Sequence, residues 1–323
     1  MSFAEKVGIS EIRKVYSWSQ KKSINRLIIS LPGSGCQYYK TKGGCSMCGF
    51  HNETKKFSHG FLYPFKIFKI LLESSLKLVH SREISEIYIF NGGSFLNDKE
   101  IPLKFQKYVF KRVSELKVIK VIFIESRIEY ISEKKLQLIS SLKSQLEIKI
   151  AIGFESQNDY IRNKIIKKSL SKKSFERTIF LISQYNLKSC AYVFLKPLKL
   201  TEKEALQEAQ KTISYLNSLN VSEIILSVAF VQKNTEMYKE YLNGNYRPPY
   251  LWTLISLIEH FLRDDIPLSV GGFSDKPKPI AITKNCDLCS NDIYLLLDEY
   301  RKYNILNKIP QCDCYKKYKQ LIL

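Results

Sequence analysis

The chain has 323 residues, of which 45% are hydrophobic, so it can bury a sizeable core as one barrel-sized domain with an appendage or as two ordinary domains. Its 51 Lys and Arg residues exceed its 31 Asp and Glu residues, which gives a net charge of +20. This charge favours a polyanionic partner, with RNA or DNA ranked before a membrane surface. Codon bias is an alternative cause of such a composition. No apolar run approaches the roughly 18 residues of a membrane span. We therefore expect a cytoplasmic protein without a membrane partner.

The first 25 residues are polar and mixed, and we assign them to a helical lead-in. Beyond them, short β-branched or aliphatic runs alternate with segments of helical spacing. Helices are expected to begin near Pro64, Asp98, Ser132 and Thr201, the last within a Thr-x-x-Glu capping box. Strands are expected at residues 26–31, 86–90, 120–124, 147–153, 190–195 and 223–230.

This alternation of strands and helices determines the expected fold class. Successive strand–helix units imply a parallel α/β sheet, and units that curl one way give a partial TIM-type (β/α)6 barrel. We place the barrel at residues 26–235 and a small C-terminal extension at residues 236–323. A doubly wound open sheet satisfies the same pattern.

Three cysteines follow the first predicted barrel strand at spacing C-x8-C-x2-C: Cys36, Cys45 and Cys48. A [4Fe–4S] cluster has four irons, so three thiolates leave one iron open for another ligand. The surrounding glycines let the backbone approach a bulky cofactor. The alternative is a structural zinc knuckle whose fourth ligand is His51, although such zinc sites usually close with four clearly spaced ligands.

Polar and glycine residues follow the other predicted strands at their carboxyl ends, where barrel enzymes carry their functional residues. The fork of Arg127 suits a carboxylate, and Glu155 suits a ribose hydroxyl. Surface ion pairs are the alternative for the charged members of this set. The set comprises Gly92, Gly93, Ser94, Glu125, Arg127, Glu155 and Gln232.

A second cysteine set, C-x2-C followed by C-x-C, stands near the C-terminus. Four thiolates in two tight pairs favour a closed tetrahedral zinc site, and a second iron–sulfur cluster is the alternative. Such a site would stabilise a small cap that has little core of its own. Its residues are Cys286, Cys289, Cys312 and Cys314. The eighth cysteine, Cys190, is expected to be a buried small hydrophobe.

The three-cysteine loop resembles that of the radical S-adenosylmethionine (SAM) superfamily. The resemblance implies that SAM binds the open iron and that Gly92 and Gly93 contact its amino group through their backbone. The superfamily pattern continues with an acidic residue where this chain has Ser94.

Several further stretches, in order along the chain, resemble the archaeosine-synthase radical SAM subunit family. They are residues 43–49, 91–96, 125–129, 152–156, 196–198, 231–235 and 246–252, followed by the C-terminal cysteines. The departures are mild: Ser46, Ile128 and Tyr250 stand where Thr, Pro and Trp are expected. Elongator-type radical SAM proteins share a similar Glu-Ser/Thr-Arg stretch but space their cluster cysteines differently.

The family resemblance implies a reaction on tRNA. A partner subunit would attach lysine to the 7-cyano-7-deazaguanine base, and this chain would cleave the lysine C–N bond to leave archaeosine, using an external electron donor. Residues that bracket the cluster cysteines are candidates for RNA stacking and phosphate contacts, or else form an ordinary solvated loop. They are Tyr38, Tyr39, Lys40, Lys42, Lys55 and Lys56.

Two other functions satisfy part of the pattern. Methylthiolation or another radical SAM modification of tRNA would require an auxiliary cluster at the C-terminal cysteines. A non-catalytic, metal-stabilised RNA-binding protein would explain the charge and the C-terminal cysteines, but it would give the three-cysteine loop no purpose.

Overall fold

The computed structural model describes residues 9–271 and 278–323, apart from the side chains of residues 53 and 55–57. These residues form two compact units. Where the structure describes them, residues 9–44, 50–152 and 173–190 form unit 1, and residues 45–49, 153–172, 191–271 and 278–323 form unit 2.

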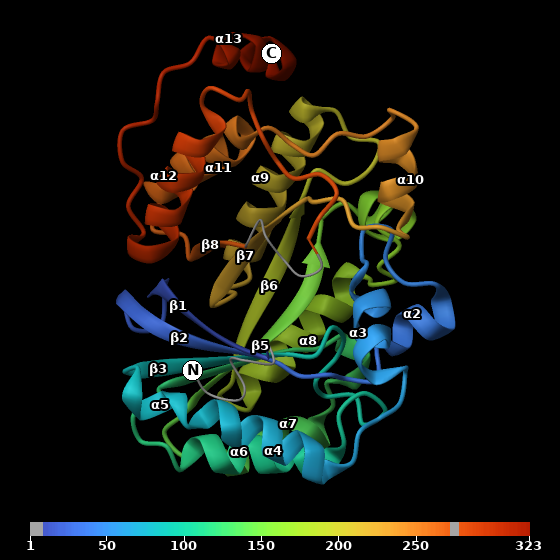
Figure 1. Cartoon of the computed structure of the whole chain (residues 1–323), viewed down its shortest axis with the longest axis vertical. Coiled ribbons are helices and arrows are strands. Elements are labelled where there is room, and N and C mark those ends of the chain that lie inside the picture. Colours follow the sequence, from blue (N-terminus) through green and yellow to red (C-terminus); the bar gives the residue numbers. More distant parts are fainter. Residues whose placement is uncertain (1–8, 272–277) are drawn as a thin grey trace. The chain divides into compact units, whose positions relative to one another are not determined.

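The strands form one sheet whose spatial order is the chain order, β1 to β8 (Figure 1). They are β1 (Ser10–Ser17), β2 (Lys22–Ser30), β3 (Ile84–Phe90), β4 (Val121–Glu125), β5 (Glu147–Glu155), β6 (Lys188–Leu195), β7 (Glu223–Val228) and β8 (Leu268–Val270). β1 is antiparallel to β2, whereas β2 to β5 pair in parallel, as do β7 and β8. A doubly wound sheet would reverse its strand order at a switch point, so the sequential order confirms the predicted singly wound α/β fold.

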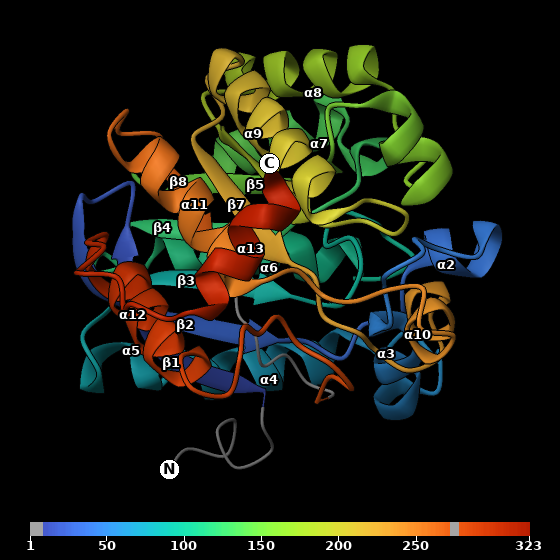
Figure 2. The same cartoon turned by 90° about the horizontal axis from the view of Figure 1, so that it is seen from above.

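The helices between the strands follow the predicted apolar stripes. They are α2 (Gln37–Lys42), α3 (Phe50–Ser58), α4 (Phe65–Leu76), α5 (Leu78–Ser81), α6 (Leu103–Ser114), α7 (Glu133–Leu142), α8 (Lys172–Gln184), α9 (Glu202–Ser218), α10 (Glu236–Leu242), α11 (Leu251–Leu262), α12 (Ser290–Tyr303) and α13 (Cys314–Ile322). In unit 1, α6 packs against both α4 and α7. In unit 2, α9 packs against α11 and α13, and Figure 2 shows α13 in front of α9.

Helix starts were predicted with mixed success. Thr201 accepts a hydrogen bond from the Glu204 backbone N–H, and the Glu204 side chain accepts one from Thr201, which confirms the capping box. Ser132 likewise caps α7. Asp98 does not cap α6, whose first residue follows Pro102. The Asp98 carboxylate instead pairs with Lys135 at 2.5 Å, a partner that local spacing does not reveal.

The predicted helical lead-in is wrong for residues 10–25. Ser10–Ser17 forms β1, which turns at residues 18–21 into β2. Two contacts with a buried carboxylate hold this hairpin: the Ser17 hydroxyl donates to Glu86 of β3, and Arg26 of β2 pairs with the same carboxylate at 2.8 Å. The strand forms because a neighbouring edge supplies its hydrogen bonds, and this information lies outside the segment itself.

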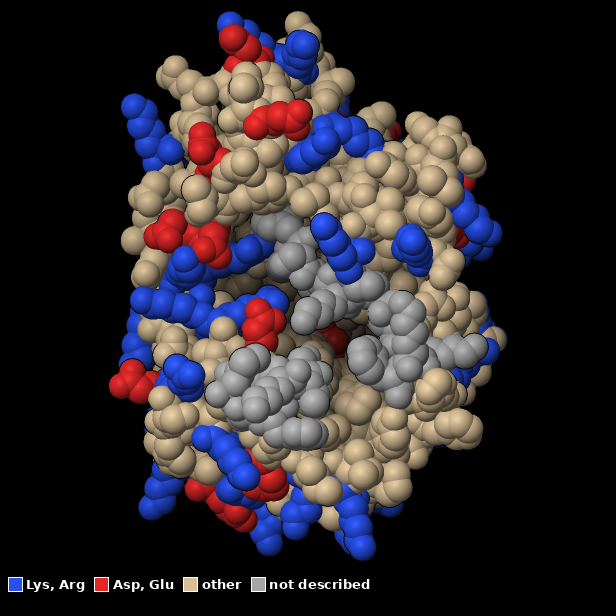
Figure 3. All heavy atoms as spheres, viewed as in Figure 1, with Lys and Arg blue, Asp and Glu red and all other residues tan. Residues whose placement is uncertain are grey.

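No helix among the described residues is both long and apolar enough to cross a membrane. On the face shown in Figure 3, Lys and Arg side chains are scattered over the surface with Asp and Glu between them. The positive charge seen on that face is therefore not gathered into a single patch.

Candidate functional site

The Gly-Gly loop after β3 is built around a buried carboxylate that sequence reasoning missed, that of Glu100. Its Oε1 accepts hydrogen bonds from the Gln37 N–H at 3.0 Å and the Asn97 amide at 2.9 Å, and its Oε2 accepts one from the Ser94 N–H at 2.6 Å. A Cβ at Gly93 would lie 1.9 Å from Oε2, so only glycine fits there. Burial raises the pKa of Glu100. The one sequence signal for this carboxylate was that Ser94 stands where the superfamily pattern has an acidic residue.

Glu100 connects this loop to Cys36, the first predicted cluster ligand. Cys36 immediately precedes α2, and its successor Gln37 donates its N–H to Glu100. The Cys36 Cα lies 3.3 Å from where a Cβ on Gly93 would stand. In unit 1, therefore, Cys36 and the Gly-Gly loop are held side by side.

The end of β4 joins the same region of unit 1. The Arg127 N–H donates to the Ser94 hydroxyl at 3.2 Å, and the Phe95 N–H donates to the Glu125 carbonyl at 2.8 Å. The Arg127 guanidinium pairs with Glu129 at 2.6 Å and lies over the Tyr38 ring at 3.8 Å. Gly92, Gly93, Ser94, Glu125 and Arg127 are thus neighbours, as expected for residues at the carboxyl ends of adjacent strands.

The other two predicted cluster ligands, Cys45 and Cys48, lie on a short loop of unit 2. The Cys48 N–H donates to the Cys45 carbonyl at 3.1 Å, which makes Cys45–Cys48 a tight turn. The Ser46 N–H donates to Ile166, and the Ser46 carbonyl accepts the Met237 N–H. The loop is therefore fastened on both sides by main-chain hydrogen bonds.

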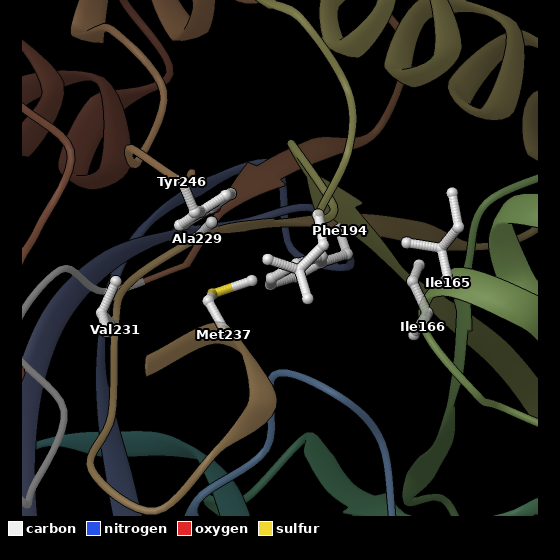
Figure 4. Packing of buried hydrophobic residues seen from close by; sticks show 8 residues of the cluster. Ile165, Ile166, Phe194, Ala229, Val231, Met237 and Tyr246 are labelled. Carbon is white, nitrogen blue, oxygen red and sulfur yellow. The ribbon is translucent and has the colours of Figure 1, made fainter. Parts of the chain in front are cut away.

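An apolar cluster of unit 2 packs against this turn. Its buried members surround Met237 in Figure 4, and Cys45 and Met47 pack against them. The cluster comprises Ile165, Ile166, Phe194, Leu198, Ala229, Val231, Met237 and Tyr246. Cys45 and Cys48 themselves remain partly exposed.

Unit 2 also contains the two remaining predicted cofactor residues. Glu155 ends β5 with a φ of +71°, and its carboxylate pairs with Lys168 at 2.8 Å. Such a backbone is strained for a residue with a side chain and is found preferentially at functional sites. The Gln232 side chain is buried and accepts the Gly49 N–H at 2.8 Å.

The predicted RNA contacts have varied surroundings. Tyr38 is buried beneath Arg127, while the ring of Tyr39 stacks on His51 with 4.1 Å between ring centroids. Lys40 and Lys42 are exposed on α2. Lys55 and Lys56 lie on α3, and their side chains are outside the described residues. Their contacts with RNA stay predictions.

The C-terminal cysteines converge in unit 2. Their four Sγ atoms lie within 4.8 Å of one another, and Cys286 is 3.5 Å from both Cys289 and Cys312. The Trp252 indole N–H donates to the Cys314 sulfur at 3.2 Å. The Cys289 backbone N–H lowers the pKa of Cys286 to about 6, while burial raises that of Cys289 to about 12. The group can hold a metal ion, which would deprotonate all of these thiols.

None of the eight cysteines, all of which are described, forms a disulfide. Cys190 is fully buried in β6, as predicted for a small hydrophobe. Of the remaining seven, the four C-terminal cysteines converge as the spacing suggested. Cys36 belongs to unit 1 whereas Cys45 and Cys48 belong to unit 2, so a cluster held by these three cysteines stays a prediction.

No family model matches the chain. An uncharacterized protein of Methanocaldococcus jannaschii is 34% identical over 233 residues, which are 72% of this chain and 63% of the relative, so the match spans less than two thirds of that protein. Archaeosine synthase subunit beta of Methanosarcina acetivorans is 24% identical over 324 residues, which cover 95% of this chain and 89% of the relative.

Solved structures share the fold. Methanocaldococcus infernus Elp3 with an N-terminal deletion superposes with a TM-score of 0.53 at 14% identity, covering 75% of this chain and 65% of that one. Streptococcus suis SuiB bound to S-adenosylmethionine superposes with a TM-score of 0.51 at 11% identity, covering 77% of this chain and 52% of that one. The chain is a homologue of proteins named archaeosine synthase subunit beta, and its fold is that of the radical SAM enzymes.

Proposed function

We propose that this chain is a radical SAM enzyme that modifies tRNA, cleaving the C–N bond of a lysine adduct on 7-cyano-7-deazaguanine to leave archaeosine. The observation that carries the proposal is similarity to an archaeosine synthase subunit beta along 95% of the chain, with the three-cysteine loop included. Its fold is one that radical SAM enzymes use.

The residues present fit a [4Fe–4S] cluster and SAM. Cys36, Cys45 and Cys48 supply three thiolates, are partly exposed and are free of disulfides. When bound, the cluster supplies the electron that splits SAM into methionine and a 5′-deoxyadenosyl radical, and that electron must come from an external donor. This reaction reaches an unactivated C–H bond, which acid–base catalysis cannot do.

The protein residues would bind and orient the cofactor and exclude water. The backbone of Gly92 and Gly93 would contact the amino group of SAM, with Ser94 beside them. Arg127 would receive the SAM carboxylate on exchanging its pairing with Glu129, and Glu155, together with Glu125, would hold polar groups of the nucleoside. Gln232 is assigned to the same cofactor region.

We assign zinc to the C-terminal cysteines. A tetrahedral zinc ion with Zn–S bonds of about 2.3 Å places its sulfurs about 3.8 Å apart. Thiolates that each bind a different iron of a cubane stand farther apart, because the cluster lies between them. Sγ atoms that all lie within 4.8 Å of one another support a single ion, and this opposes a methylthiolation function with an auxiliary cluster.

The proposed function is tested by incubating lysine-adduct tRNA with reconstituted protein, SAM and a reductant. We expect 5′-deoxyadenosine and methionine in the reaction mixture and archaeosine among the nucleosides of the digested tRNA. If 5′-deoxyadenosine forms but archaeosine does not, the chain is a radical SAM enzyme that acts on another substrate. Protein that binds SAM but never forms 5′-deoxyadenosine would support the non-catalytic RNA-binding alternative.

We expect a lysine-transferring partner subunit to contribute much of the affinity for tRNA. The charge on the visible face is scattered, and no RNA-binding module was recognised in the sequence. We expect the chain alone to bind tRNA roughly tenfold or more weakly than the pair, since two linked binding surfaces add avidity. Filter binding at one fixed salt concentration measures this, and equal affinity for the two preparations would contradict it.

A further inference from the structure

The residue directly after Cys48 is held by a side chain from a distant part of unit 2. Gly49 donates its N–H to Oε1 of Gln232 at 2.8 Å, across 183 positions of the sequence. A Cβ on Gly49 would lie 2.7 Å from that oxygen and 2.8 Å from the Gln232 Cβ. Position 49 is therefore glycine because Gln232 approaches it closely.

The main chain around Gln232 is rigidly placed between β7 and α10. The preceding residue, Val231, exchanges hydrogen bonds with Ala281 and Ile280, each at 2.8 Å. The Thr235 hydroxyl donates to the Gln232 carbonyl at 2.8 Å and caps α10 by accepting the Tyr238 N–H. Gln232 thus extends from a fixed support, and its side chain sets the position of Gly49.

The other end of the Gln232 amide has no hydrogen-bond partner among the described residues. Its Nε2 atom is buried, and the whole residue is 2% exposed. The amide cannot be turned around to relieve this, because the Gly49 N–H requires the oxygen as its acceptor. A buried donor without an acceptor is costly, so this one marks a place where an acceptor is expected to bind.

We propose that Gln232 is a positioning residue for the cluster: its oxygen fixes Gly49, and its amide N–H donates to a sulfur of the cluster bound through Cys45 and Cys48. This inference rests on the proposed function. Hydrogen bonds to cluster or thiolate sulfur stabilise the more negative, reduced state and so raise the reduction potential. Gln232 would thereby make the cluster easier to reduce before SAM is split.

Two substitutions separate the two ends of the amide. Gln232→Met removes both donor and acceptor without adding charge, whereas Gln232→Glu keeps an acceptor for Gly49 and loses the donor. Lys233→Met at the exposed neighbouring position is the matched control. Melting temperatures of the metal-free proteins verify that each variant folds.

The acceptor end is tested in metal-free protein by hydrogen exchange at the Gly49 amide. We expect exchange to be roughly fivefold or more faster in Gln232→Met, because one hydrogen bond is lost, and close to the wild-type rate in Gln232→Glu and Lys233→Met. Equal rates in wild type and Gln232→Met would overturn the fixing of Gly49.

The donor end is tested by the midpoint potential of the reconstituted cluster, without tRNA. We expect a more negative potential in Gln232→Met than in wild type or Lys233→Met, and a still more negative one in Gln232→Glu, which adds charge. An unchanged potential in Gln232→Met would overturn the donor role while leaving the proposed function intact. Wild-type protein that assembles no cluster would instead overturn the proposed function, and the donor role with it.

Discussion

Replacing Cys45 by Ala is expected to abolish the formation of 5′-deoxyadenosine and archaeosine. Two thiolates, Cys36 and Cys48, do not retain a cubane against loss of iron, and without the open iron SAM has no site to bind. Cys45 packs against the apolar cluster of unit 2, where alanine remains compatible with packing, so the loss is chemical rather than a collapse of the fold. Iron content, the charge-transfer absorbance of the reconstituted protein and product analysis measure the effect.

Cys190→Ala provides the matched control for this experiment. Cys190 is a fully buried thiol of β6 outside both cysteine sets, and its removal deletes the same atom. This variant is expected to keep about four irons at the N-terminal loop and to turn over, with a modest loss of stability from the small cavity. A Cys45→Ala protein that still holds its cluster and cleaves SAM would refute the three-cysteine assignment.

Replacing Cys289 by Ser is expected to release the C-terminal metal and to loosen the segment from residue 286 onward. Structural zinc contributes about 10–16 kcal/mol of apparent binding free energy in small zinc-finger peptides, and this free energy is also folding free energy. Beyond the cysteines, α13 buries Tyr318, which lies 3.3 Å from Ser256 and approaches the Tyr250 ring, and it packs against α9.

The expected results are a lower melting temperature, loss of about one zinc per chain, and fast amide exchange in α12 and α13. Asp313→Ala is the control, because Asp313 stands between Cys312 and Cys314 but its side chain is exposed and pairs only with Lys316 among the contacts seen. Zinc retention should also weaken as pH falls, since protons compete for the thiolates. About eight irons and no zinc in wild-type protein would show that the C-terminal site is a second cluster.

Local patterns were read correctly where the cause lies within the segment. The capping box at Thr201 and the Ser132 cap depend on residues three positions away, and the apolar stripes of α4, α6 and α9 recur at helical spacing. The predicted strand runs became β2 to β7 for the same reason, although the short β8 was not foreseen. The helical lead-in failed because a neighbouring strand, and not the segment, determined its conformation.

The residues of the candidate site likewise fall into those that the sequence pattern indicates and those that only the structure reveals. The cysteine spacings and the residues after the strands could be read from the sequence, because chain order fixes which side chains follow a parallel strand. The role of Glu100 could not be read from the sequence, since its hydrogen bond to the Gln37 N–H spans 63 positions. The same holds for Gln232, whose hydrogen bond to the Gly49 N–H spans 183 positions.

The sequence by itself determined the order of strands and helices, the two cysteine sets and the excess of positive charge. Only the tertiary structure decided that Glu100 accepts the N–H of Gln37 and that Gln232 accepts the N–H of Gly49. It also brought the four C-terminal sulfurs close enough together for one ion. The physical reason is that periodicity and capping act between near neighbours, whereas a buried polar group must find its partner wherever folding brings one within reach.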